Sequence, residues 1–187
     1  MFQNLRKSIN QVENYSDEEF EVLVFSLEVV HLTKGEFFLK EGQINNHLAF
    51  VDKGLAMYYK VVDGTEIPLD FAIEGQWISY LKSFTNRIPS DINIKVLEDT
   101  TLFTLEIHKT QELMTKHPKF LALRSYHVEK SLAEVTQHSA NLATLDAKQR
   151  YYQLMKEKPY LINRVPQYYL AAYLGIKPQS LSRIRKE

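Results

Sequence analysis

Gly175 is the residue that most constrains this chain, because it separates two short stretches of helical periodicity near the C-terminal end of the sequence. On a 3.6-residue period, the apolar residues on each side of it fall on one face of a short helix: Leu170, Ala171 and Leu174 before it, Leu181 and Ile184 after it. Glycine readily takes the left-handed conformation that ends a helix, and Pro178 suits the first turn of the next. Residues 167–186 are therefore predicted to form two helices joined by a tight turn.

This layout is a helix-turn-helix, in which the second helix can enter the major groove of DNA. A small residue at the helix crossing and buried apolar residues near the turn meet its steric requirements: Ala171, Ile176, Leu181 and Ile184. The second helix then presents donors for base edges and phosphates, namely Gln179, Ser180, Ser182, Arg183 and Lys186, with Lys177 and Arg185 beside them. The alternative interpretation is an ordinary helical hairpin with a solvated face.

The charge distribution favours DNA binding. From Ala147 onward the chain carries nine Lys and Arg against two Glu, a net charge of +7, whereas residues 1–146 carry 14 basic and 21 acidic residues, a net charge of −7. A basic module suits a polyanion, whose binding depends mainly on the neutralisation of phosphates. The zero net charge of the whole chain therefore indicates two parts of opposite sign.

Composition indicates an ordinary soluble protein of 187 residues, with 44% hydrophobic and 25% charged residues. No apolar run approaches the roughly 20 residues that a membrane span needs, and the polar start MFQNLRKSINQ lacks the core of a secretion signal. We therefore expect a cytoplasmic protein without a membrane partner. The absence of cysteine excludes disulfides, thiolate nucleophiles and cysteine-ligated clusters.

The N-terminal half predicts one helix followed by many short strands. Ser16 and Glu19 have capping-box spacing before a helix at about residues 17–27. Between residues 29 and 105, stretches rich in β-branched and aromatic residues alternate with turns that contain glycine: VVHL, FFL, LAFV, LAMYYKVV, IPLDFAI, INIKVL and TLFTL. Evenly spaced short strands predict an antiparallel barrel or jelly roll, which can pack solid or hold a ligand.

A long helix is predicted to begin near His117-Pro118. Residues at alternating steps of four and three form a heptad seam of about three repeats, Leu121, Ser125, Val128, Leu132, Val135, Ser139 and Leu142, so that pairing with a second copy is expected. Alternatively, this stripe packs on its own barrel. Thr144-Leu145-Asp146 is predicted to be a hinge, and a further helix is expected from about Ala147 to Lys156.

This order of elements, together with AAYLGIKPQSLSRIRK, resembles the CRP/FNR family of bacterial transcription regulators, and the resemblance covers nearly the whole chain. It implies an α+β protein with an N-terminal antiparallel β-roll of the jelly-roll, cyclic-nucleotide-binding-like type, a long dimerisation helix, and a C-terminal winged-helix or helix-turn-helix domain. The domains expected are residues 1–116 (β-roll sensor), 117–145 (dimerisation helix and hinge) and 146–187 (DNA binding). The expected partners are double-stranded DNA, a second copy and RNA polymerase.

In this resemblance, Gln179 and Arg183 match the positions that read base edges, with Ser180 and Ser182 nearby. The predicted dimer interface comprises Leu121, Val128, Leu132, Val135 and Leu142. Lys177 departs from the family pattern, because Ser or Thr would cap the recognition helix there. The sequence given ends at Glu187, just after this helix, so any wing contact is expected from Tyr160 to Arg164.

The cyclic-nucleotide cassette of the family is altered at both of its charged positions. Ser79-Tyr80-Leu81 stands where a glutamate meets the ribose, and Pro89-Ser90 stands where an arginine meets the cyclic phosphate. A buried phosphate without a cationic partner is costly to desolvate, so we expect no cyclic AMP and no other cofactor. Arg87, two residues away from this pair, is an alternative cation for a phosphate.

A different small effector is the remaining hypothesis for the roll. Its candidate lining is Trp77, Tyr80, Ser83, Arg87 and Ser90 from the cassette, and Arg124 or His127 from the long helix. Alternatively, these residues fill the roll and brace the helix. Nothing in the sequence identifies the ligand.

Other function classes have weaker support. The six histidines show no metal-binding spacing, so no metal site is expected. A cupin-type enzyme would need three or four ligands clustered on barrel strands, and we expect no enzyme activity. A protein–protein scaffold that uses the terminal helices does not explain their positive charge, and it predicts binding that depends little on salt.

Overall fold

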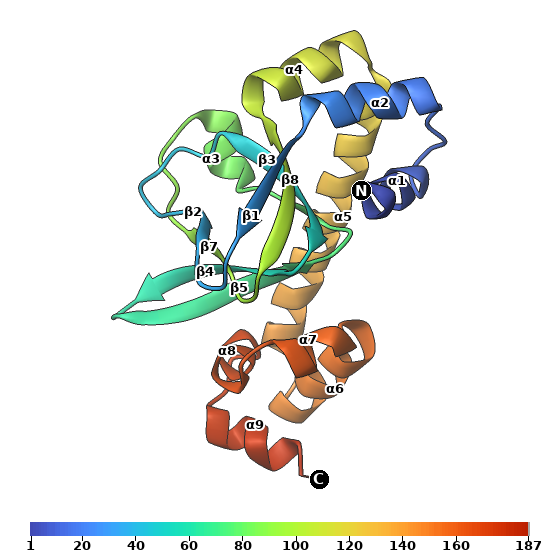
Figure 1. Cartoon of the computed structure of the whole chain (residues 1–187). Helices are drawn as coiled ribbons and strands as arrows, with labels where there is room; N and C mark the ends of the chain where they lie inside the picture. Colours follow the sequence, from blue (N-terminus) through green and yellow to red (C-terminus); the bar gives the residue numbers. More distant parts are fainter. Residues whose placement is uncertain (187) are drawn as a thin grey trace. The chain divides into compact units, whose positions relative to one another are not determined.

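The computed structural model of the protein describes residues 1–186 (Figure 1). Its helices are α1 (Gln3–Asn10), α2 (Asp17–Ser26), α3 (Leu81–Asn86), α4 (Ile107–Lys116), α5 (Lys119–Thr144), α6 (Ala147–Glu157), α7 (Pro159–Arg164), α8 (Gln167–Tyr173) and α9 (Pro178–Ile184). Its strands are β1 (Glu28–Leu32), β2 (Phe37–Leu39), β3 (His47–Lys53), β4 (Leu55–Val62), β5 (Thr65–Ile73), β6 (Trp77–Ile78), β7 (Asn93–Val96) and β8 (Thr100–Glu106).

The chain divides into two compact units. The first comprises Met1–Tyr58 and Phe71–Lys130, and the second comprises Tyr59–Asp70 and the residues from Ser131 onward. The second unit therefore contains the outer part of the β4–β5 hairpin, the second half of α5 and the four helices that follow it. Among residues 1–186, none of the helices combines the length and apolar character needed to cross a membrane.

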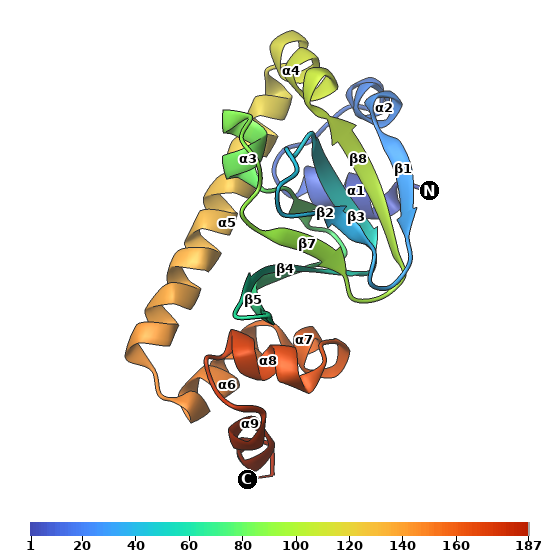
Figure 2. The ribbon, with the colours of Figure 1, turned by 90° about the vertical axis from the view of Figure 1, so that its left-hand side faces the viewer.

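The strands form two four-stranded sheets, with the orders β1-β8-β3-β6 and β2-β7-β4-β5 (Figure 2). In the first sheet, β8 pairs antiparallel with β1 from Glu28 opposite Thr104 to Leu32 opposite Thr100, and β3 pairs antiparallel with the other edge of β8. Six of the seven predicted stretches lie within strands, and the seventh, INIKVL, extends one residue beyond each end of β7. The prediction of an antiparallel β-roll is thus confirmed, because alternation of apolar residues is a local property that these sheets preserve.

Each face of the first sheet contributes to a hydrophobic core within the first unit. One core gathers around the stacked rings of Phe50 and Phe103, whose centroids lie 6.2 Å apart. The other contains the small and branched residues Ala49, Val51, Ala56, Ala72, Ile78, Ile94, Val96 and Leu102, together with Leu39. Alternate residues of β3 point into different cores, as the two-residue period of a strand requires.

The N-terminal helices pack on the Phe50–Phe103 core. α2 has the predicted capping box, in which the Ser16 hydroxyl accepts from the Glu19 N–H at 3.1 Å and the Glu19 carboxylate accepts from the Ser16 N–H at 2.7 Å. The Tyr15 hydroxyl donates to the carbonyl of Lys119 at 3.0 Å, which joins this region to the start of α5. α1, α3 and α4 were not predicted from the sequence.

In the second unit, a short break at the predicted hinge separates α5 from α6. α5 ends at Thr144, and Asp146 caps α6 by accepting from the Gln149 N–H at 2.9 Å. The helix predicted from Ala147 to Lys156 is confirmed to within one residue. The segment Tyr160 to Arg164, from which a wing contact was expected, lies in helix α7, which Pro159 begins.

Candidate nucleic-acid interface

α8 and α9 form the helix-turn-helix predicted around Gly175. Gly175 has a φ of 67°, and its N–H donates to the carbonyl of Ala172 at 2.9 Å. The N–H of Ile176 donates to the carbonyl of Ala171 at 3.0 Å. These two bonds form a Schellman motif, which ends α8 and sets the direction in which the chain leaves it.

The residues expected to pack the two helices are mostly buried. Ala171, Leu170 and Leu181 are fully buried, and Leu174 is buried as well. Ile176 and Ile184 are only half-buried, which corrects the expectation that they belong to the interior. The physical reason is size, because a module of a few short helices buries a smaller fraction of its surface than a large domain does.

The outer surface of α9 carries the predicted DNA-binding set. Gln179 and Arg183 are exposed, as are the flanking cations Lys177, Arg185 and Lys186, whereas Ser180 and Ser182 are half-buried. Within residues 1–186, none of these four cations forms an ion pair with a carboxylate. Their charges therefore remain available to a polyanion.

Lys177 is the N-cap of α9 and makes no side-chain capping bond. Its position and conformation agree with the predicted loss of a cap. Gln167, at the start of α8, donates from its side chain to the carbonyl of Pro178 at 3.5 Å, which links the first turns of the two helices. The first turn of α9 is thus held by α8 and by Pro178 rather than by its own N-cap side chain.

The outer part of the β4–β5 hairpin packs with these helices in the second unit. The hydroxyl of Tyr169, on α8, donates to the Glu66 carboxylate, and this bond together with burial raises the pKa of the tyrosine. Pro68 is buried, as is Tyr59. The helix-turn-helix therefore packs against strand residues that lie about one hundred positions earlier in the sequence.

Lys158 forms the charged centre of this packing. Its ammonium lies 3.5 Å from the Asp70 carboxylate and 3.3 Å from the Glu134 carboxylate. Burial alone would lower the pKa of Lys158, but Asp70, Tyr173 and Glu134 outweigh it and raise the pKa. Nearby, the ring of His138 stacks on that of Tyr173, with centroids 4.0 Å apart and planes 5° apart.

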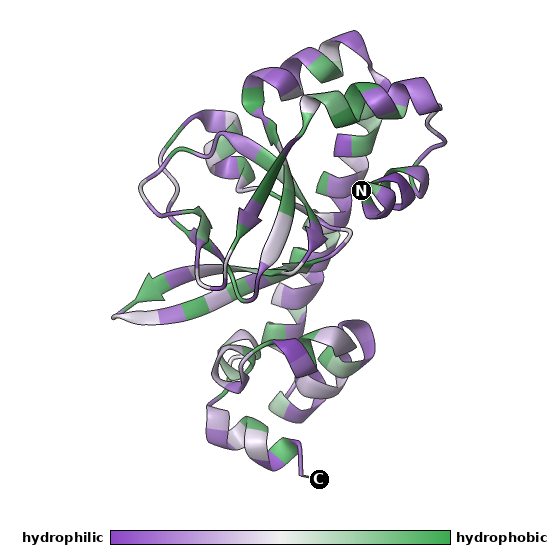
Figure 3. Cartoon of the chain, in the orientation of Figure 1, coloured by the Kyte–Doolittle hydropathy of each residue, from purple (hydrophilic) through white to green (hydrophobic). Residues whose placement is uncertain are grey.

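The predicted seam of α5 carries exposed apolar side chains. Leu132 is 66% exposed, Val135 51%, Leu121 47% and Leu142 40%, whereas Val128 is half-buried. Figure 3 shows hydrophobic and hydrophilic residues interspersed along this helix. Exposed leucines and valines at heptad spacing are typical of a helix that pairs with another helix.

The comparisons with known proteins agree with this arrangement. Residues 29–117 match the family model for the cyclic nucleotide-binding domain. No curated protein sequence matches the chain. Among solved structures, FixK2 from Bradyrhizobium japonicum has a TM-score of 0.76 at 14% identity, over 86% of this chain and 83% of that one.

Two further structures show the same likeness. The global regulator CLP from Xanthomonas campestris, described as responsive to c-di-GMP, has a TM-score of 0.74 at 16% identity, over 91% of this chain and 90% of that one. A protein named as a CRP/FNR-family transcriptional regulator, from Eubacterium rectale, has a TM-score of 0.69 at 16% identity, over 92% and 82%. The chain has the CRP/FNR fold.

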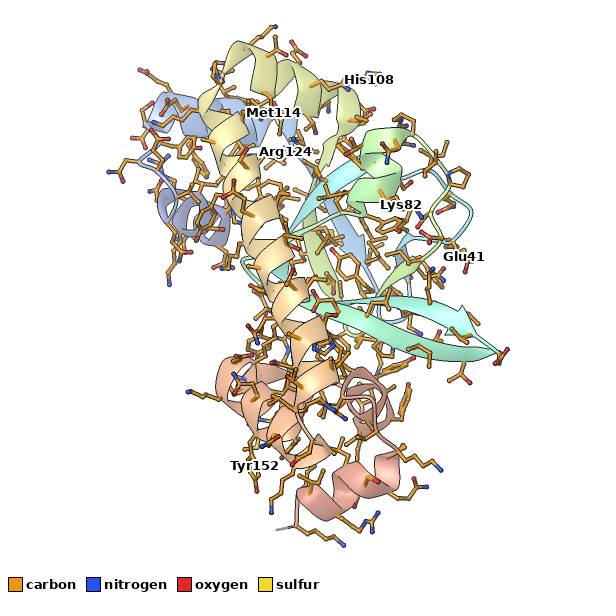
Figure 4. The ribbon with its side chains drawn as sticks, turned by 180° about the vertical axis from the view of Figure 1, so that it is seen from behind. Glu41, Lys82, His108, Met114, Arg124 and Tyr152 are labelled. Atoms are coloured by element: carbon orange, nitrogen blue, oxygen red, sulfur yellow. The ribbon has the colours of Figure 1, made fainter. Side chains whose placement is uncertain are left out.

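Residues 79–90, which were predicted to correspond to the cyclic-nucleotide cassette, lie within the region that matches the family model. Arg87, the alternative cation, donates to the carbonyl of Asn45 at 2.9 Å and to the side chain of Asn46. Lys82, on α3 (Figure 4), lies 3.3 Å from the Asp91 carboxylate. Both cations of the segment therefore have partners within the chain, and the absence of cyclic nucleotide binding stays a prediction.

The hydroxyl groups of the same segment are also hydrogen-bonded internally. The Ser83 hydroxyl accepts from the Asn45 N–H at 2.9 Å and donates to the Ile88 carbonyl at 2.6 Å. The Ser90 hydroxyl donates to the Ile92 carbonyl at 2.7 Å, and Tyr80 donates to Asp91 at 2.5 Å. Four candidate effector residues, Tyr80, Ser83, Arg87 and Ser90, thus form hydrogen bonds within the loops around α3.

Trp77 and His127 differ from the other candidates. Their rings lie 6.4 Å apart, and the Trp77 Nε1 and His127 Nε2 atoms are both buried without a hydrogen-bond partner in the described structure. Burial, with a smaller effect of Lys130, lowers the pKa of His127 to about 4. Arg124, one helical turn earlier on α5, is half-buried (Figure 4). The assignment of these residues to an effector site remains a prediction.

Among residues 1–186, no group of three or more His, Cys, Asp and Glu is arranged to hold a metal ion. Sequence reasoning missed the roles of Glu66, Asp70 and Lys158. The Asp63-Gly64 turn predicted a hairpin, but no local pattern states which surface the end of a hairpin will contact.

Proposed function

We propose that this protein is a homodimeric transcriptional regulator of the CRP/FNR type that binds DNA in a sequence-specific manner. The observation that carries the proposal is the surface of α9, where Gln179 and Arg183 are exposed next to three further cations, and these cations form no ion pair with a carboxylate in residues 1–186. The likeness to structures of transcriptional regulators supports the same assignment.

The side chains of α9 have distinct roles in this proposal. Arg183 can pair with the O6 and N7 atoms of guanine, and Gln179 can pair with the N6 and N7 atoms of adenine. Lys177, Arg185 and Lys186 contact phosphates, which positions the helix without selecting a base. Specificity therefore depends mainly on two residues.

A second copy of the chain is the proposed occupant of the exposed α5 seam. Pairing would bury Leu132 and Val135, the two most exposed apolar residues of the seam. It would also place the two α9 helices of the dimer on one face of the duplex, about 34 Å apart. Because the dimer has two-fold symmetry, its two half-sites would form a near-palindromic operator. The single copy described does not itself provide this pairing.

The roll is proposed to respond to an effector other than a cyclic nucleotide, because Arg87 and Lys82 already have partners within the chain. The buried nitrogens of Trp77 and His127 favour a ligand that offers a hydrogen-bond acceptor to the indole N–H. RNA polymerase is the proposed protein partner at the promoter. The operator follows from sequencing of the DNA that the protein retains.

The test is retention of genomic DNA fragments by the purified protein, followed by sequencing of the retained DNA and by a salt titration. We expect a near-palindromic motif with wild-type protein and its loss with Arg183→Ala. Lys7→Ala, which removes an exposed cation of α1 in the first unit, is the control for loss of charge alone and should retain the motif.

The alternative functions give different results in the same experiment. A protein–protein scaffold would retain little DNA, and its binding to a partner protein would change little between low and high salt. A cupin-type small-molecule enzyme would likewise retain no motif. Retention of random fragments that Arg183→Ala does not change would contradict sequence-specific binding by α9.

A further inference from the structure

Arg150, on α6, binds main-chain carbonyls from three other positions in the second unit. Its Nε donates to the carbonyl of Leu174 at 2.9 Å. Its Nη1 donates to the carbonyl of Leu145 at 2.5 Å and to that of Leu142 at 3.4 Å. One side chain therefore joins the end of α5 to the end of α8.

These carbonyls suit a guanidinium group. The last four carbonyls of a helix have no N–H partner inside the helix and carry the negative end of its dipole. Leu142 lies in the last turn of α5, and Leu174 is the C-cap of α8. A planar fork of fixed donors holds such carbonyls at defined angles, which the flexible point charge of a lysine does not.

The turn of the helix-turn-helix also packs directly on the end of α5. A Cβ atom built on Gly175 would lie 3.4 Å from the Leu142 Cδ2 atom and 4.0 Å from the Arg150 Nη2 atom. A Cβ at this position would make ordinary van der Waals contact with Leu142, so the turn lies close to the last seam residue. Arg150, Gly175 and Leu142, which belongs to the proposed dimer interface, therefore form one joint between the turn and the end of α5.

We propose that Arg150 is a positioning residue that fixes the angle between the dimer helix and the recognition helix, and thereby selects the spacing of the DNA half-sites. This inference rests on the proposed function. The recognition helix α9 follows Leu174 through the Schellman turn, and its buried Leu181 ties it to the module. A change of angle at the joint would therefore move α9 along the duplex relative to its copy.

The experiment compares wild-type protein with Arg150→Ala and Arg150→Lys on the operator found by fragment retention. Binding is measured on the operator, on versions with one or two base pairs inserted or removed between half-sites, and on an isolated half-site. Lys156→Ala, which removes an exposed cation of the same helix, is the matched control. Thermal unfolding by circular dichroism is recorded for each protein.

We expect wild-type protein and Lys156→Ala to lose about tenfold or more in affinity for each base pair of altered spacing, because half-sites must match the repeat of the duplex. Arg150→Ala should bind the half-site within about twofold of wild type and lose less than about threefold per base pair. Arg150→Lys should be intermediate, because an ammonium cannot hold the three carbonyls in one plane.

Two results would overturn the inference. The first is spacing selectivity in Arg150→Ala equal to that of wild type. The second is a loss of half-site binding in Arg150→Ala that parallels a fall in melting temperature, which would show that Arg150 only maintains the fold. If wild-type protein retains no motif, the proposed function fails, and this inference fails with it.

Discussion

The ammonium of Lys158 lies 3.5 Å from the Asp70 carboxylate, although the two residues are 88 positions apart in the sequence. Asp70 belongs to β5, and Lys158 lies between α6 and α7. A second carboxylate, that of Glu134 on α5, lies 3.3 Å from the same ammonium. One cation thus links β5, α5 and the junction of α6 and α7 within the second unit.

Replacing Lys158 by Ala should destabilise the protein by about 1–3 kcal/mol, because two partly buried carboxylates would lose their shared partner. Thermal unfolding followed by circular dichroism provides the measurement. The control is Lys116→Ala, which breaks the exposed pair with Glu112 on α4 and should leave the melting temperature nearly unchanged. Equal effects of the two substitutions would show that the Lys158 cluster contributes no more than a surface pair.

Gly54→Ala should destabilise the first unit more than Gly42→Ala does. The new Cβ would lie 2.2 Å from Thr100 Oγ1 and 2.7 Å from Thr100 Cα, and the φ of 114° is strained for alanine. A loss of about 2–4 kcal/mol is expected from overpacking and strain together. Gly42→Ala, with a φ of 86° and nothing within 4 Å of the new atom, should lose only about 1 kcal/mol in urea unfolding. A smaller effect at Gly54 would mean that β8 can move away.

Stability should fall as the pH is lowered from 7 to 5, because the pKa of His127 is about 4 in the folded state and its ordinary value is 6.5. Between these values the unfolded chain binds the proton and the folded chain does not, so stability rises with pH. We expect His127 to account for about 1–2 kcal/mol of this fall, after allowance for its partial exposure.

His127→Gln should flatten the profile of unfolding free energy against pH. Urea unfolding at pH 7 and at pH 5 provides the measurement. An unchanged slope in His127→Gln would show that the pKa of this histidine is the same in the folded and the unfolded chain.

Replacing Leu132 and Val135 by Asp should convert the proposed dimer to a monomer, because each dimer would bury four carboxylates along its seam. Sedimentation equilibrium of the double variant provides the measurement. Gln137→Asp, which adds a charge at an exposed position away from the seam on the same helix, should remain dimeric. A wild-type protein that sediments as a monomer at all concentrations would contradict pairing through α5.

Arg183→Ala and Lys186→Ala should weaken DNA binding in different ways. Loss of Arg183 should cost about 1–3 kcal/mol at the operator and relax the choice of one base, because it removes a bidentate base contact. Loss of Lys186 should weaken operator and random DNA alike and reduce the salt slope by about one. Fluorescence anisotropy on both DNAs separates the two roles. Equal losses on both DNAs for both variants would contradict the assignment.

Several elements could be predicted from local sequence because short-range sterics determine them. The seven strand stretches follow from two-residue alternation, and the capping box of α2 follows from Ser16 and Glu19. Gly175 ends α8 as expected, because few other residues take a φ of 67° without strain. The exposure of Gln179 and Arg183 on α9 also follows from the 3.6-residue period of a helix.

The sequence by itself determined the order of α2, the strand-rich region, the long helix α5, α6 and the helix-turn-helix, together with the exposure of Gln179 and Arg183. The tertiary structure alone decided that Arg87 donates to Asn45, that the tip of the β4–β5 hairpin packs with α8, and that Arg150 joins two helix ends. The physical reason is the sequence separation of the residues that make contact. Periodicity and turn chemistry depend on neighbours a few positions away, whereas these contacts join residues 24 to 103 positions apart, and only the folded chain selects them among many chemically equivalent partners.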